Sequence, residues 1–188
     1  GAIGKGYAIQ VAADLLRELE RALGVRSAFY FVPRQGSLLG YAAGTPDPFY
    51  DVRSDRFRSL FPVLLDAGCE IGLHASYRAG ENEETLAAEK ATLEQACGRR
   101  VTGNRHHYWR LDPRRTESTL RLHQRVGLEF GSSLVHERHV GWRRGLCWPY
   151  FPFHPTERRE LTTLQMSVAW MDDQLFGHRR FKPGDPPA

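Results

Sequence analysis

The sequence has little lysine, few cysteines and no long apolar run. No stretch reaches the roughly 18 apolar residues that a membrane-spanning helix requires, so we expect no membrane span. The residues from Gly1 onward lack the basic-then-apolar pattern of a signal peptide. This absence favours a cytoplasmic location, and the missing initiator methionine indicates a domain or fragment of a longer protein.

The scarcity of cysteine excludes a disulfide-based scaffold. The three cysteines, Cys69, Cys97 and Cys147, are odd in number, far apart and form no Cys-x-x-Cys pair. Each has apolar or aromatic neighbours, and a buried thiol behaves as a small apolar side chain. We expect them to be structural.

The positive charge is mostly arginine, because Lys5, Lys90 and Lys182 are the only lysines. The formal net charge of +4 at pH 7 could indicate a nucleic-acid partner. Nucleic-acid-binding modules gather positive charge on one face, whereas the arginines here are scattered and often adjoin acids, as in Arg17-Glu18. We therefore expect no nucleic-acid partner.

Length and composition predict one globular domain. A chain of 188 residues can bury a core of its own, and its 41% hydrophobic and 26% charged residues are ordinary for folded proteins. We assign residues 1–181 to one α/β domain. The Pro- and Gly-rich residues 182–188 are expected to form a disordered tail or linker.

Four segments with helical patterning each end at a glycine and lead into a strand-forming run. Glycine just past a helix supplies the left-handed turn that starts the next element. Helices are expected over 7–23, 54–67, 82–97 and 115–126, strands over 25–32, 69–73, 99–102, 128–130 and 161–168, and a long loop over 36–50. Alternating helices and strands predict an α/β fold with a parallel sheet.

In such sheets ligands bind at the carboxyl ends of the strands. The residues expected there are 74–77, 103–108, 131–133 and 170–173. Within them, His74 could be a metal ligand or a general acid–base, or equally a buried histidine bonded to backbone.

Arg105, His106, His107 and Tyr108 follow one of these strands. In an extended segment, Arg105 and His107 would share one side, with His106 and Tyr108 on the other. A guanidinium beside an imidazole suits binding a carboxylate and holding a metal or a proton donor. The alternative is an exposed polar loop.

Other candidates carry weaker signals. His136 and His139 have a helical spacing but lie in an expected loop, and His123 is expected at the surface or at the edge of the core. Ser132 and Ser133 lack the Gly-x-Ser-x-Gly context of a serine hydrolase. The aromatic segment 141–153, which includes Trp148, could stack on sugars or pack beneath a Pro-rich loop.

Several strings taken together resemble a bacterial branch of the polysaccharide deacetylase family. They are Glu70-Ile-Gly-Leu-His-Ala-Ser-Tyr77, Gly103-Asn-Arg-His-His-Tyr108, Gly131-Ser-Ser-Leu134, Gly145-Leu-Cys-Trp-Pro-Tyr150 and Met171-Asp172. The resemblance implies a distorted (β/α) barrel. It also implies hydrolysis of acetyl groups on a carbohydrate substrate by water that a divalent metal, expected to be zinc, activates.

The resemblance also assigns roles to individual residues. His74 matches the family's first metal histidine, and Arg105 matches the arginine that orients a catalytic carboxylate. Tyr108 matches the residue whose backbone amide stabilises the oxyanion. The family's second metal histidine would fall at Arg78, so His107 is interpreted as its replacement. Substrate contacts are expected from Tyr77, Trp109, Trp148 and Asp172.

Two of the family's motifs have no counterpart here. The acidic motif expected before the first helix is absent, and no late strand ends in histidine unless His178 serves. We therefore expect a barrel that is incomplete at both ends. The leading hypothesis is a metal-dependent carbohydrate deacetylase. The alternative is a catalytically silent glycan-binding or envelope polysaccharide assembly domain on the same scaffold.

Overall fold

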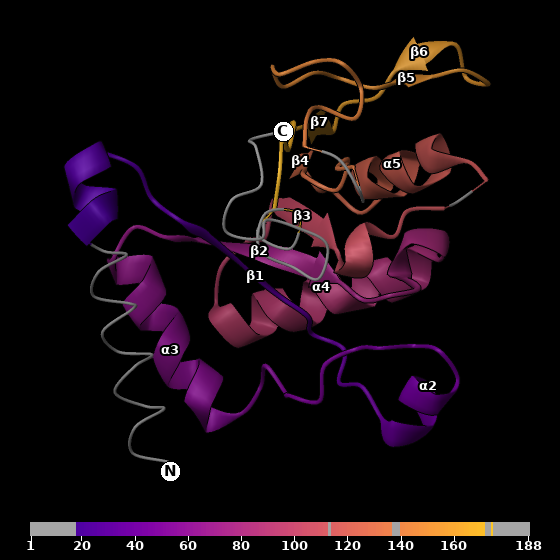
Figure 1. Cartoon of the computed structure of the whole chain (residues 1–188). Coiled ribbons are helices and arrows are strands. Elements are labelled where there is room, and N and C mark those ends of the chain that lie inside the picture. Colours follow the sequence, from indigo (N-terminus) through magenta and orange to yellow (C-terminus); the bar gives the residue numbers. More distant parts are fainter. Residues whose placement is uncertain (1–17, 113, 137–139, 172–173, 175–188) are drawn as a thin grey trace, which may run out of the picture.

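A five-stranded parallel sheet forms the centre of the fold (Figure 1). The computed structural model describes residues 18–112, 114–136, 140–171 and 174. The strand order is β1–β2–β3–β4–β7, and every neighbouring pair is parallel. The strands are β1 (Ala28–Phe31), β2 (Glu70–Ala75), β3 (Gly103–His106), β4 (Phe130–Gly131) and β7 (Leu164–Gln165). The expectation of an α/β fold with a parallel sheet is thus confirmed.

Helices lie in the connections from β1 to β2, from β2 to β3 and from β3 to β4, as is usual for parallel crossovers, whereas the described part of the connection from β4 to β7 contains β5 (Phe153–His154) and β6 (Arg159–Glu160). The remaining elements are α2 (Leu38–Ala42), α3 (Asp55–Asp66), the 3₁₀ turn η1 (Ala79–Glu81), α4 (Glu83–Cys97), the 3₁₀ turn η2 (His107–Trp109) and α5 (Thr116–Arg125). Strands β5 and β6 form a small antiparallel hairpin beside the main sheet (Figure 1).

Helix α4 shows why the helix–glycine–strand pattern predicted the fold well. Asn82 caps its start, where the side-chain oxygen accepts a hydrogen bond from Thr85 N at 2.7 Å. Gly98 ends it in the left-handed conformation, with φ of 68°. Both boundaries agree with the sequence prediction.

Three expected segments differ from the structure. The strand expected over 99–102 begins only at Gly103, since Val101 N donates to the Glu94 carboxylate instead of a neighbouring strand. The strand expected over 161–168 contributes only β7. The expected loop 36–50 contains α2, which Ser37 caps by accepting a hydrogen bond from Gly40 N.

The two ends of the chain lie largely outside the described residues. The helix expected over 7–23 is described only at 18–23, which is helical. The tail expected over 182–188 is outside the description altogether. No helix in the described ranges is both long and apolar enough to cross a bilayer.

The main core lies between one face of the sheet and helices α3 and α4. Alternation along β2 turns Ile71, Leu73 and Ala75 into this apolar cluster with Phe61 of α3 and Leu86 of α4. Glu70 and His74 occupy the alternate positions and are only partly buried. The face of the sheet away from the core therefore carries polar side chains that can reach a ligand.

The loop between β1 and α3 is closed at its base. Val32 N donates to the Tyr50 hydroxyl at 2.8 Å, and Gly36 N donates to Pro48 O at 2.7 Å. A Cβ atom at Gly36 would lie 2.1 Å from the Asp47 carbonyl oxygen, so only glycine permits this approach. The base of the loop is thus fixed, and Asp47 is fixed with it.

Candidate active site

His74 lies near the carboxyl end of β2, opposite Arg105 of β3. Its Nδ1 is 2.8 Å from the Arg105 carbonyl oxygen. A carbonyl can only accept, so Nδ1 donates and Nε2 keeps its lone pair. Burial, reinforced by the nearby His107 imidazole, lowers the pKa of His74 to about 4. His74 is therefore a neutral imidazole at pH 7 with Nε2 available.

His107 stands beside His74, with ring centres 5.1 Å apart. On its other side, His107 Nδ1 is 3.3 Å from Oδ1 of Asp47. Asp47 is only 3% exposed, and the same oxygen accepts a hydrogen bond from Tyr77 N at 2.8 Å. Burial opposes ionisation of Asp47, but the hydrogen bonds from His107 and Tyr77 outweigh it and lower the pKa of this carboxyl.

Asp47 is the site residue that the sequence analysis missed. It comes from the loop 36–50, far from the motifs at the strand ends, and only the fold brings it to His107. The available signal was its position between Pro46 and Pro48, a rigid setting for a single carboxylate. A carboxylate that holds Nδ1–H of a histidine fixes its tautomer and leaves Nε2 as the base.

Arg105 occupies the same polar face of the sheet. Its Nε donates to Ser132 Oγ at 3.0 Å. Its guanidinium carbon lies 4.9 Å from the Tyr30 ring centre and 5.0 Å from that of Trp109. Burial lowers the pKa of Arg105, but a guanidinium remains charged in proteins. Its predicted role in orienting a carboxylate stays a prediction, because no carboxylate of the described residues pairs with it.

Tyr108 and Trp109 are held in an unusual backbone conformation. The extended segment considered from Arg105 onward ends at His106, and both residues after His107 have φ of 54°. Such left-handed residues cost roughly 1–3 kcal/mol each and cluster at functional sites. Tyr108 is 62% exposed and packs against His107 and Tyr77, with ring centres 4.7 and 5.9 Å away.

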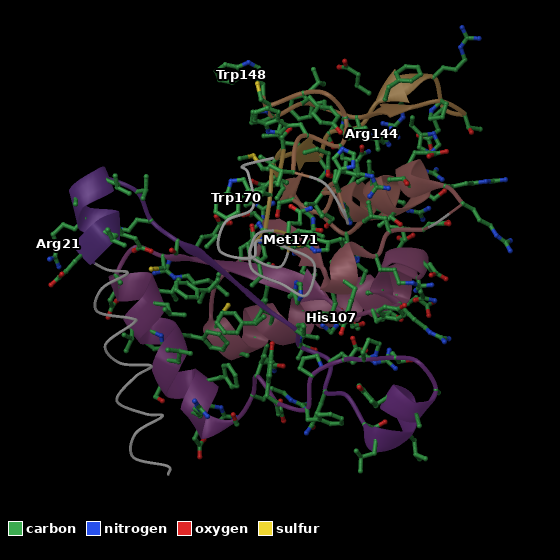
Figure 2. The ribbon with its side chains drawn as sticks, in the orientation of Figure 1. Arg21, His107, Arg144, Trp148, Trp170 and Met171 are labelled. Atoms are coloured by element: carbon green, nitrogen blue, oxygen red, sulfur yellow. The ribbon has the colours of Figure 1, made fainter. Side chains whose placement is uncertain are left out.

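A cavity of about 390 Å³ opens beside this cluster. Tyr77, Tyr108 and Trp109, all predicted site residues, form aromatic walls, and the cavity is completed by Arg110, Leu111, Asp112, Thr116 and Arg143. Trp148, another predicted contact, is 76% exposed and lies well away from His107 (Figure 2). The last predicted contact, Asp172, lies outside the described residues, as does His178.

The donor chemistry of His74 and His107 suits zinc, because a neutral imidazole held by its other nitrogen is a common zinc ligand. A zinc site needs a third protein ligand. The described part of the chain brings together no three His, Cys, Asp or Glu side chains placed to hold a metal ion. Arg78, at the position of the family's second histidine, is exposed. These residues do not complete a metal site, so no reaction step is derived through one.

Comparison with solved structures supports the assignment of the fold, whereas comparisons of the sequence find no match. No family model and no curated protein matches the chain. A crystal structure from Mycobacterium smegmatis, described as a "putative polysaccharide deacetylase", superposes with a TM-score of 0.54 at 19% identity. The match covers 92% of this chain and 50% of that one, so this chain spans about half of its neighbour's length. The described residues thus form a barrel-like α/β fold of polysaccharide deacetylase type around five parallel strands, which confirms the fold class expected from the sequence. The gaps expected at both ends of the barrel fall largely outside the described residues.

Proposed function

We propose that this protein acts as a hydrolase that removes acetyl groups from a carbohydrate. The observation that carries the proposal is the trio at the strand ends, in which buried Asp47 holds His107 beside the neutral imidazole of His74. An aromatic-walled cavity adjoins this trio, on a scaffold similar to that of the protein described as a "putative polysaccharide deacetylase".

In the proposed reaction, His107 moves the proton. Asp47 holds Nδ1–H, so Nε2 accepts a proton from water as the water oxygen bonds to the acetyl carbon. The carbonyl oxygen becomes an oxyanion, for which we propose the backbone amide of Tyr108 as a donor. The carbon–nitrogen bond then breaks, His107 returns its proton to the leaving nitrogen, and acetate and a free amino sugar are released. For an O-acetyl group, the leaving atom is oxygen.

The aromatic walls supply substrate binding. Tyr77 and Trp109 offer flat apolar faces, which suit the faces of a sugar ring. Tyr108 sits between His107 and Tyr77, so a sugar stacked in the cavity lies close to the proposed base. We propose Tyr77 and Trp109 as substrate contacts, with exposed Trp148 as a contact for more distant sugars.

Acetate release from N-acetylated chitotetraose tests this proposal with the full chain. Enzymatic acetate measurement and mass spectrometry are expected to show about one acetate released for each free amine formed. Release that is no faster than from heat-unfolded protein would contradict the proposal. Binding of the tetrasaccharide without acetate release would favour the silent glycan-binding alternative.

We also propose that His74 and His107 can serve as two ligands of a zinc site, as an alternative state of the same residues. His107 would then use Nε2 for zinc instead of as the base, so the reaction proposed above belongs to the metal-free protein. Equilibrium dialysis of the full chain against zinc at pH 7.5 is expected to show about one bound ion, and His74→Ala is expected to weaken binding at least tenfold, since losing a group that supports a metal site typically costs 10- to 100-fold. His136→Ala, outside the trio, serves as the control. Unchanged zinc stoichiometry and affinity in a folded His74→Ala protein would contradict this assignment.

A further inference from the structure

Two arginines, Arg110 and Arg143, line the aromatic cavity, and they differ in how many hydrogen bonds and ion pairs their guanidinium groups form within the protein. The guanidinium of Arg110 already has protein partners: its Nη2 lies 2.6 Å from Glu81 Oε1, and its Nη1 donates to Tyr77 O at 3.0 Å. Its guanidinium carbon also lies 4.6 Å from the Tyr77 ring centre. Arg110 therefore has its charge balanced and serves to hold the aromatic wall in place.

Arg143 has far fewer contacts with protein groups in the described structure than Arg110 has. Its one hydrogen bond to the described residues runs from Nη1 to Val135 O and is long, at 3.4 Å. No carboxylate in the described ranges forms an ion pair with it. The side chain is exposed and lines the cavity, so most of its five N–H donors remain available to a ligand.

The cavity also contains one carboxylate, Asp112, which has partners of its own. Its Oδ1 accepts hydrogen bonds from Arg114 N at 2.8 Å and Arg115 N at 3.2 Å, just before α5 begins. These backbone donors stabilise its negative charge. With Asp112 and Arg110 both satisfied, the charge that the cavity offers to a ligand is the positive charge of Arg143.

We infer that the cavity binds a sugar residue that carries a carboxylate, as in a uronate-containing acidic glycan. Tyr77 and Trp109 provide flat faces for the ring, while the planar guanidinium of Arg143 matches a carboxylate through two parallel hydrogen bonds. This inference rests on the proposed function, because it names the sugar class that the same site holds.

Calorimetric titration of the full chain tests the inference with two matched probes. A hyaluronan tetrasaccharide alternates N-acetylglucosamine with glucuronate, whereas chitotetraose carries acetyl groups and no carboxylate. In 20 mM salt we expect hyaluronan tetrasaccharide to bind about tenfold more tightly than chitotetraose. Added salt screens the charge interaction, so the difference in affinity between the two glycans should become smaller.

Three variants identify the residue responsible. Arg143→Gln is expected to lower the affinity for hyaluronan tetrasaccharide to that for chitotetraose. Arg143→Lys keeps the positive charge but loses the planar guanidinium, so its affinity is expected to lie between those of Arg143→Gln and the unchanged protein. Arg99→Gln removes the same charge at the amino end of β3, away from the cavity, and is expected to bind like the unchanged protein. Circular dichroism confirms that each variant is folded.

Failure of this inference and failure of the proposed function give different results. Equal affinity for the two glycans, or a preference for hyaluronan that survives in Arg143→Gln, overturns the inference. Acetate release from chitotetraose would leave the proposed function standing in that case. Arg143-dependent binding of hyaluronan without acetate release from either glycan supports the inference and contradicts the proposed hydrolysis.

Discussion

Replacing His107 by alanine is expected to lower kcat/KM for acetate release by roughly 100- to 10,000-fold, the usual contribution of a positioned general acid–base. His107 is the imidazole that Asp47 orients, and the proposed reaction uses it twice, first as base and then as acid. The loss should fall on kcat with KM nearly unchanged, because the aromatic walls of the cavity remain. Initial rates over a range of chitotetraose concentrations separate the two constants.

Asp47→Asn provides the matched variant for this experiment. Asparagine preserves the shape of the side chain but removes the charge that stabilises a protonated His107, so we expect a loss of activity and a shifted pH–rate profile. A merely structural role for Asp47 would leave that profile in place. If a folded His107→Ala protein kept its activity within threefold, His107 would not be the base.

The second large effect is a loss of stability in mild acid, which we assign to a buried histidine pair. His106 of β3 and His123 of α5 are fully buried, with their Nε2 atoms 2.8 Å apart. The Nδ1 atom of each is buried without a hydrogen-bond partner in the described structure. Burial lowers the pKa of His123 to about 3 and that of His106 well below its usual value.

The direction of the effect follows from proton uptake. In the unfolded chain each histidine has a pKa near 6.5, so below that pH the unfolded state binds protons that the folded state excludes. Stability is therefore full above about pH 6.5 and falls as the pH drops toward the folded-state pKa values, by about 1.4 kcal/mol per pH unit for each histidine. Between pH 7.5 and pH 5.0 the pair should lower the unfolding free energy by on the order of 4 kcal/mol.

Urea unfolding at pH 7.5 and at pH 5.0 measures this loss. His123→Leu removes one titrating group, so its unfolding free energy should fall by roughly 2 kcal/mol less between the two pH values than that of the unchanged protein. His74, whose pKa burial also lowers, contributes equally to both proteins and cancels in this comparison. Comparing the two proteins also cancels the effect of Glu89. Burial raises the pKa of this carboxyl, so Glu89 makes the folded state more stable, not less, as the pH falls. An identical pH dependence in His123→Leu and the unchanged protein would rule out the pair as the cause.

The same histidine pair shows where prediction from sequence stops. Helix and strand types followed from local patterns, and the start of α4 next to residue 82 and its end at Gly98 were predicted correctly. His123 was expected at the surface or at the edge of the core, and it is completely buried. Its partner His106 is distant in sequence. Only the folded structure, in which α5 lies beside β3, shows that the Nε2 atoms of the two imidazoles form a hydrogen bond with each other.

The candidate site divides in the same way. The placement of His74 and of the segment from Arg105 to Tyr108 was predictable, because the carboxyl ends of parallel strands share one edge of the sheet. Asp47 was not, because its role depends on a long loop whose path local patterning does not determine. Cys147 was expected to be structural and is exposed; its neighbouring aromatics wrongly suggested a buried position.

The loop that carries Asp47 has a fixed base and a free tip. One carboxylate oxygen serves both Tyr77 N and His107, so docking the loop and orienting the imidazole are a single event. The tip is α2, where Leu38 and Leu39 are 80% and 85% exposed. Its length and composition can therefore change while the contacts of Asp47 with Tyr77 and His107 stay the same, which makes α2 a natural place for related proteins to diverge and for an inserted tag to be tolerated.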